Sequence, residues 1–162
     1  LNMQDYSPAG GIMYNNLKRL VEWEVETYRS VDGGGTGEEF PDNLKDDYNS
    51  PGNKWYDCCS GETWIIGRFN EPIWIKSITL QSANDCDGRD PYTVSFWADD
   101  EKYLCKYDNL EFTNRYEKKN FLVDSEKPVS SIKILIERNK SYAQFGHWGD
   151  GTQLAQVIFY HI

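Results

Sequence analysis

The sequence predicts an all-β sandwich, or jelly roll, of about eight antiparallel strands. Short segments with an apolar residue at every second position recur along the chain, which is typical of half-buried strands. Turn-forming residues separate these segments, and no segment after Gly33 keeps a helical apolar period for three turns. A chain of 162 residues is long enough for one domain with its own hydrophobic core.

The first element is a polar stretch, Leu1–Leu20, which we expect to form an arm outside the sandwich, with the domain at 21–162. The first strand is predicted at 21–27, where apolar residues alternate with glutamates. Glycines at 33–35 end it, and a long loop rich in turn formers follows.

Strands are then predicted in close succession, because β-branched and aromatic residues dominate each segment. A turn at Asn70–Pro72 separates the first two, and no repeat or linker divides the chain. The expected strands are Thr63–Phe69, Ile73–Gln81, Tyr92–Ala98, Lys102–Lys106, Asn120–Val123, Ser131–Glu137 and Gln153–His161.

The net charge is −9, from 26 acidic and 17 basic side chains. A negative surface repels phosphate backbones and anionic headgroups, so we expect no nucleic-acid partner. The sequence lacks the roughly 20 consecutive apolar residues of a spanning helix, so membrane insertion is not expected either. Calcium and neutral ligands are compatible with the charge, and both an extracellular and a cytoplasmic location stay open.

Four cysteines, Cys58, Cys59, Cys86 and Cys105, allow three disulfide pairings. Two of them are adjacent, and no Cys-x-x-Cys spacing provides a zinc clamp. Because a domain of this length does not need disulfides to fold, we expect free, partly buried thiols. The redox state of the adjacent pair stays open.

The segment Ser82–Pro91, Ser-Ala-Asn-Asp-Cys-Asp-Gly-Arg-Asp-Pro, is the most specific motif. It resembles a loop of the discoidin-like, or coagulation factor V/VIII C-terminal-type, domains of the galactose-binding-like superfamily. The branch it is closest to contains carbohydrate-binding modules and the C-terminal module of peptide N-glycanases. Further landmarks agree in order from about residue 38 to the end: Asn53-Lys54-Trp55, Trp64 with Phe69 and Pro72, and Gln153-Leu154-Ala155-Gln156-Val157.

The resemblance implies a calcium ion held between the first long loop and the last strand, through carboxylate and carbonyl oxygens. The residues that would hold it are Asp46, Asp47, Asn49, Asn53, Ala155 and Gln156. Two of them depart from the family: Asn53 replaces a threonine, and the neutral Gln156 replaces an acid. A calcium site and a loop of solvated acids are therefore both open.

Ligand contacts are expected in the glycine-flanked segment 141–151, because loops carry function on rigid sandwiches and aromatic faces stack on sugars. For each residue a purely structural role is the alternative, above all for Asn84 and Arg89, which can hold the hairpin loop together. The candidate ligand-binding residues are Tyr56, Asn84, Arg89, Tyr142, Phe145, His147, Trp148 and Asp150.

The function that the sequence favours is noncatalytic carbohydrate binding through loops at one end of the sandwich, with a glycan or glycoprotein as partner. The alternative is a protein–protein interaction module within a larger assembly, for which the polar arm would be a docking element. An enzyme is not expected, because His147 and His161 are the sole histidines and no nucleophile, metalloprotease or phosphate-loop motif is present.

Overall fold

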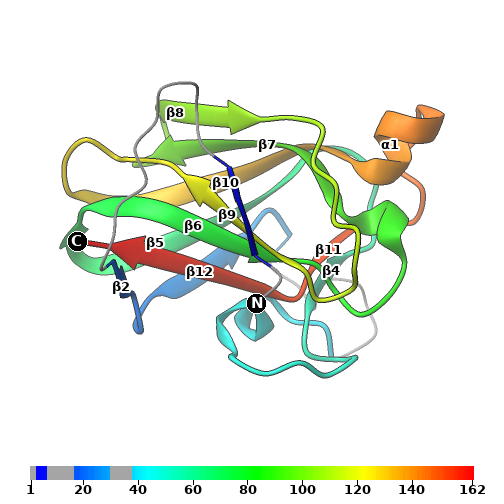
Figure 1. Ribbon diagram of the computed structural model, residues 1–162, viewed down its shortest axis with the longest axis horizontal. Coiled ribbons are helices and arrows are strands. Elements are labelled where there is room, and N and C mark those ends of the chain that lie inside the picture. The colour runs from blue at the N-terminus through cyan, green and yellow to red at the C-terminus, as the bar shows by residue number, and fades with distance from the viewer. Residues whose placement is uncertain (1–2, 7–16, 30–37) are drawn as a thin grey trace.

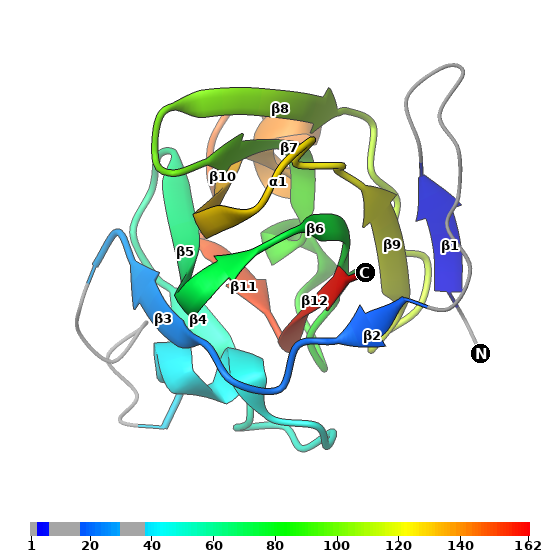
Figure 2. The ribbon, with the colours of Figure 1, turned by 90° about the vertical axis from the view of Figure 1, so that its left-hand side faces the viewer.

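The computed structural model describes residues 3–6, 17–29 and 38–162 (Figure 1). Its body is a sandwich of two five-stranded sheets, which Figure 2 shows as curved layers around a shared interior. One sheet has the order β1-β9-β6-β12-β2 and the other has the order β3-β5-β10-β7-β8. All pairings are antiparallel except β1 with β9.

The first sheet comprises β1 (Met3–Tyr6), β9 (Lys118–Leu122), β6 (Ile75–Gln81), β12 (Gln156–His161) and β2 (Lys18–Arg19). The second comprises β3 (Glu24–Thr27), β5 (Thr63–Ile73), β10 (Val129–Asn139), β7 (Pro91–Ala98) and β8 (Lys102–Tyr107). A third, two-stranded sheet pairs β4 (Trp55–Asp57) with β11 (Thr152–Leu154). The helical segments are η1 (Pro41–Lys45), η2 (Asp87–Arg89) and α1 (Lys140–Phe145).

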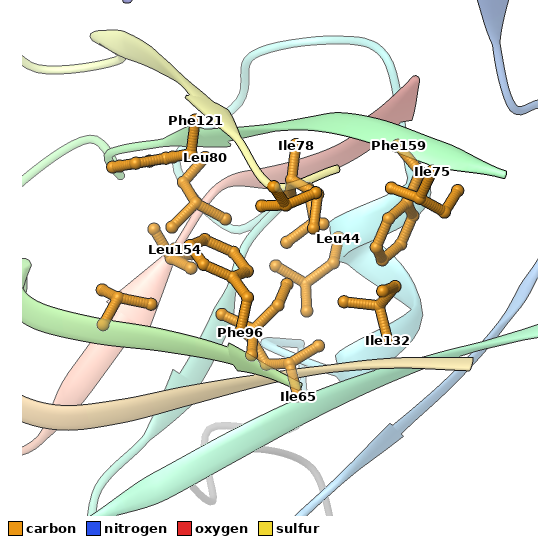
Figure 3. Close-up of a cluster of buried hydrophobic side chains, with 14 of the residues drawn as sticks. Leu44, Ile65, Ile75, Ile78, Leu80, Phe96, Phe121, Ile132, Leu154 and Phe159 are labelled. Carbon is orange, nitrogen blue, oxygen red and sulfur yellow. The ribbon is translucent and has the colours of Figure 1, made fainter. Parts of the chain in front are cut away.

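The core lies between the two large sheets, where the apolar sides of the strands meet. Figure 3 shows Phe121, Leu80, Ile78 and Phe159 of one sheet facing side chains of the other, with Leu44 and Leu154 between them. The opposing residues in this view are Phe96, Ile65 and Ile132. All nine of these side chains are 0% exposed, so burial of their apolar surface holds the two sheets against each other.

Gly67 on β5 shows how closely the layers approach. A Cβ at this position would lie 2.6 Å from the Phe159 ring, which also meets Trp23 edge to face at 4.8 Å between ring centroids. Phe159 therefore fills the space that a side chain on β5 would need, and only glycine fits there.

The structure confirms the predicted all-β sandwich and alters several of its elements. The expected turn at Asn70–Pro72 is wrong, because β5 runs on to Ile73 and β6 begins at Ile75. The expected closing strand is broken at Ala155, where β11 leaves the small sheet and β12 joins the large one. Neither β4 nor α1 was predicted.

At the start of the chain the alternation predicts the buried face correctly from Trp23 onward. Val21 is 83% exposed, whereas Trp23 and Thr27 are buried. Within the expected arm, the described residues form β1 and β2, which extend the edges of one sheet. The boundary between arm and domain at residue 20 stays a prediction.

Within the described residues the cysteines carry free thiols. Cys58, Cys59 and Cys86 are exposed and Cys105 is half-buried, so the expected burial is wrong for three of the four. The single α-helix of the described residues is too short to cross a membrane.

Candidate functional site

One end of the sandwich carries η2, α1 and the β4–β11 pair, which Figure 1 shows gathered on the same side of the molecule. The segment η2 contacts both α1 and β11. These elements bring together three stretches that are far apart in the sequence: the end of β4, the 82–90 loop and the 140–151 loop. We refer to this region as the loop end.

The 140–151 loop is built around Asn139, whose side chain is fully buried. Its carbonyl oxygen caps α1 by accepting from the backbone N–H of Tyr142 at 2.8 Å. Its amide nitrogen donates to the backbone oxygens of Trp148 at 2.9 Å and Gly151 at 2.7 Å. Gly146 ends the helix in the left-handed conformation, with φ of 76°. A single asparagine thus fixes both the start of the loop and its return.

Arg89 is the central cation of the loop end. Its Nε and Nη2 donate to the two carboxylate oxygens of Asp150 at 3.0 and 2.7 Å, and its Nη1 donates to Gln153 at 3.2 Å. The guanidinium carbon lies 4.2 Å from the centre of the Tyr56 ring. The Tyr56 hydroxyl donates to the backbone oxygen of Asp150. Three candidate residues from three separate segments therefore form one cluster.

The charge of this cluster is accessible on one side. The Arg89 side chain is 15% exposed and that of Asp150 is 66% exposed. The hydrogen bonds from Arg89 hold the pKa of Asp150 below its usual value, so the carboxylate stays ionised at neutral pH. Burial raises the pKa of Tyr56, so its hydroxyl stays protonated. The cluster offers a carboxylate acceptor and the edge of a fixed guanidinium to a ligand.

The aromatic candidates form two pairs beside this cluster. The rings of Tyr142 and Trp148 lie 5.4 Å apart, and those of Phe145 and His147 are stacked at 6.0 Å. Tyr142 is 39% exposed and Phe145 69% exposed, whereas Trp148 is half-buried. Exposed rings next to a charged hydrogen-bonding cluster are what stacking on a sugar ring requires.

Asn84 has a different environment, because it belongs to the internal bonding of the 82–90 loop. Its side-chain oxygen accepts from the ammonium of Lys54 at 3.0 Å, and Asp85 accepts from the same group at 2.9 Å. Lys54 is itself buried, so these two acceptors stabilise its charge. Gln153 donates to the Asp85 backbone oxygen at 2.7 Å. These hydrogen bonds favour the structural role that was the alternative for Asn84.

The Arg-Asp pair of the motif is also divided in the structure. Asp90 is buried and receives two hydrogen bonds from Arg115, at 3.0 and 2.6 Å. Arg115 also donates to the backbone oxygen of Asp85 at 3.2 Å and so ties the loop to the body. Asp90 is therefore structural, whereas Arg89 faces the cluster with Asp150.

The residues expected to hold calcium lie near one another but already have other partners. Asp47 pairs with Arg19 at 3.3 Å, which holds the pKa of that carboxylate below its usual value. The side-chain oxygen of Asn49 accepts from Gln81 at 3.2 Å. The amide nitrogen of Asn53 donates to the Tyr48 backbone oxygen at 2.9 Å.

Of the other three members only Asp46 carries a charge. Asp46 is half-buried, Ala155 uses its backbone N–H on Gln81 at 2.9 Å, and Gln156 is buried and neutral. Across the described ranges, no group of three or more His, Cys, Asp or Glu side chains could hold a metal. The Arg19 guanidinium balances the charge of Asp47, which lowers the attraction of this loop for a cation, and the calcium site stays a prediction of the resemblance.

Three residues important to the loop end were not among the candidates: Lys54, Gln153 and Asn139. Lys54 and Gln153 act through partners about 30 and 65 residues away, so no local pattern marks them, whereas Asn139 caps the short helix that the sequence did not predict. Lys54 and Gln153 lie inside two motifs that resemble the family, Asn53-Lys54-Trp55 and Gln153–Val157. Their place in these motifs is the sequence feature that could have identified them as important residues.

No family model and no curated protein matches the chain. Solved structures do match its fold. A fucolectin from striped bass (Morone saxatilis) serum has a TM-score of 0.65 and 10% identity over 87% of this chain, which spans 47% of the fucolectin. An F5/8 type C domain from Bacteroides fragilis has a TM-score of 0.64 and 12% identity, over 91% of this chain and 98% of its own.

A CBM32 module from Clostridium perfringens, solved with GalNAc-β-1,3-galactose, has a TM-score of 0.63 and 10% identity over 86% of this chain and 95% of its own. Identities this low bear on the fold and not on the function. The chain shares the β-sandwich fold of these solved structures, which is the fold that the Ser82–Pro91 motif and its companion landmarks predicted.

Proposed function

We propose that this chain is a noncatalytic glycan-binding module whose site is the loop end. The observation that carries the proposal is the Arg89–Asp150 pair, fixed over the Tyr56 ring and bordered by exposed aromatic side chains. In this site a sugar ring stacks on Tyr142 or Trp148, and its hydroxyls bond to Asp150 and Arg89.

The solved structures of the same fold support this proposal. Several were determined as sugar-binding modules or with sugars bound: the lectin domain of lectinolysin with Lewis b antigen, a fucose-binding module of Streptococcus pneumoniae, and the CBM32 module with its GalNAc disaccharide. Those sugars are properties of those proteins.

A glycan array on the purified, folded chain tests the proposal, run beside the variants Trp148→Ala and Trp74→Ala. Trp74 is the matched control, because it is also a partly exposed tryptophan, with 38% exposure, but lies far from the loop end. It directly precedes β6, and the 82–90 loop of the loop end follows the opposite end of that strand. We expect glycans that the wild type and Trp74→Ala bind equally and that Trp148→Ala binds at least about tenfold more weakly. A folded chain that binds no glycan would overturn the proposal.

The alternative, a protein–protein interaction module, makes the opposite prediction on the same samples. Under this alternative the chain binds no glycan on the array. It captures a protein partner instead, and deletion of residues 1–20 abolishes that capture. Calcium remains a prediction of the resemblance, and arms of the array with calcium and with a chelator test it. Because Asp47 is paired with Arg19, we expect the two arms to agree.

A further inference from the structure

A second hollow lies on the outer face of the β3-β5-β10 sheet, beside the segment that follows β4. Its volume is about 530 Å³, and none of its lining residues belongs to the Arg89 cluster or to the 140–151 loop. Trp64 faces outward here because its neighbour Ile65 is fully buried in the core, and side chains alternate along a strand. The lining residues are Tyr28, Arg29, Ser60, Gly61, Glu62, Trp64, Lys133 and Leu135.

Two aromatic rings form one wall of this hollow. Tyr28 and Trp64 are stacked, with 5.8 Å between ring centroids and 21° between planes. The backbone N–H of Tyr28 donates to the Trp64 oxygen at 3.1 Å, so the two residues are held side by side. Tyr28 is 54% exposed, so this wall of the hollow is open to solvent.

Lys133 supplies a charge at the same place. Its ammonium lies 5.5 Å from the Trp64 ring centre, and it is half-buried on β10. Among the residues that the structure describes, no carboxylate lies within ion-pair distance of it. The contrast with the loop end is clear, since Lys54, Arg89 and Arg115 are each paired with an aspartate there.

Arg29 adds fixed donors. Its guanidinium lies 4.7 Å from the Tyr28 ring centre and is bonded to Asp57, a carboxylate that is 2% exposed. Asp57 also accepts from Thr63 at 2.7 Å, so the arginine is anchored from below while 28% of its side chain stays exposed. A guanidinium has five N–H donors, and Asp57 cannot use all of them.

We propose that this hollow is a second saccharide site, specific for a sugar that carries a carboxylate, such as a uronic or sialic acid. The sugar ring packs against Tyr28 and Trp64, and its carboxylate pairs with Lys133 and the outer edge of Arg29. An anion is the complement of an ammonium without a carboxylate within ion-pair distance, and the Glu62 side chain that also lines the hollow is exposed to solvent. The net charge of −9 does not prevent this, because salt screens charges beyond about 8 Å at physiological ionic strength.

The inference goes beyond the proposed function and does not depend on the loop end. The test therefore uses Trp148→Ala as background, in which the loop-end site is disabled. The array holds sialylated and uronate-containing glycans together with their neutral counterparts. It is probed with the Trp148→Ala chain and with three double variants, in which Trp64→Ala, Lys133→Gln or Lys133→Arg is added to Trp148→Ala. Trp74→Ala in the same background is the control, because Trp74 also carries a lysine over its ring, Lys76 at 4.2 Å.

We expect the Trp148→Ala chain to bind acidic glycans and not their neutral counterparts. Trp64→Ala and Lys133→Gln should each weaken this binding about tenfold, whereas Lys133→Arg and Trp74→Ala should retain it. Binding should also weaken as salt is raised, because the contact is partly electrostatic. Melting curves establish that each variant is folded. If Trp64→Ala does not fold, Lys133→Gln still tests the site, because it removes only the charge of a half-buried side chain.

The outcomes separate the two proposals. If the wild type binds glycans and the Trp148→Ala chain binds neither acidic nor neutral ones, the loop end is the site and the second site is overturned. If acidic glycans bind and depend on Trp64 and Lys133 alone, the second site stands and the loop-end proposal falls. Silence from every folded variant overturns both.

Discussion

Arg89 is held on three sides, by Asp150, Gln153 and the Tyr56 ring. A side chain fixed in this way loses little conformational entropy when a ligand binds, so its remaining surface is well suited to recognition. The sequence left the role of Arg89 open, because the partners that hold it come from other segments of the chain. A structural loop arginine and a ligand-binding arginine share the same local pattern, and only the exposed Asp150 distinguishes them here.

Replacing Arg89 with methionine should weaken glycan binding about tenfold or more, because Asp150 loses the partner that fixes its carboxylate. Titration of the array-selected glycan by calorimetry measures the change. The matched control is Arg68→Met, since Arg68 is exposed and pairs with Glu26 on the sheet face. Equal affinities in the two variants would remove Arg89 from the site.

Asp85 should make the stability of the chain sensitive to acid. Burial acts to raise its pKa, but hydrogen bonds from Lys54 and Gln153 outweigh it and lower the pKa below the ordinary 3.8. A carboxylate with a depressed folded-state pKa stabilises the fold above its unfolded-state pKa. This stability is lost as the pH falls through the folded-state pKa.

The Asp85→Asn variant should therefore melt below the wild type by a constant margin above about pH 5, and the margin should shrink below about pH 4. Thermal melts monitored by circular dichroism from pH 3 to pH 7 measure it. A margin that grows toward acid would contradict the assignment of Asp85 as the ionised partner of Lys54.

At the scale of elements, the 140–151 loop depends on how closely its return packs against β4. Gly151 has φ of 120°, and a Cβ there would lie 2.9 Å from the Cys58 Cα and still closer to the Asp57 backbone oxygen. Gly146 also has a positive φ, 76°, but no atom lies within 4 Å of a Cβ added there. A side chain at Gly146 would therefore cause backbone strain alone, whereas a side chain at Gly151 would cause both backbone strain and a steric clash.

Gly151→Ala should lower the free energy of unfolding by about 3 kcal/mol or more, because backbone atoms of β4 must move. Gly146→Ala should cost about 1 kcal/mol, the strain of a left-handed alanine alone. Urea denaturation of both variants measures the difference. Similar losses in the two would mean that the loop can shift away from β4 without cost.

Most strands could be predicted from the sequence because alternation is a local signal. The strand predicted at Ser131–Glu137 became β10, two residues longer at each end, because its pairing with β5 and β7 continues past the alternating residues. The break at Ala155 could not be predicted. The Ala155 N–H bonds to Gln81 on β6, a contact that only the folded sheet creates.

At the scale of the whole molecule, the order of landmarks from about residue 38 onward was sufficient to predict the fold. The candidate site was predicted in part. Its aromatic and charged members in 141–151 were found, but the cluster with Arg89 and Tyr56 required three distant segments to meet. The hollow at Trp64 gave no sequence signal, because Tyr28 and Lys133 are ordinary surface residues until β3, β5 and β10 align.

Deleting residues 1–20 should preserve both the fold and glycan binding while lowering the melting temperature by roughly 3–8 °C. The deletion removes β1 and β2 from the sheet edges and the Arg19–Asp47 pair, but every loop-end residue follows β3. Scanning fluorimetry and the same glycan titration check both parts. Loss of glycan binding in a folded truncated chain would place part of the site in the deleted segment.

The most direct test of the central claim, that glycans bind at the loop end, is the movement of tryptophan indole resonances in a nitrogen-15 correlation spectrum during titration with the array-selected glycan. The resonance of Trp148, assigned by its absence from Trp148→Phe, should move most, while that of Trp55, 1% exposed in the core, should stay in place. Glycan binding that leaves the Trp148 resonance unmoved would contradict the account.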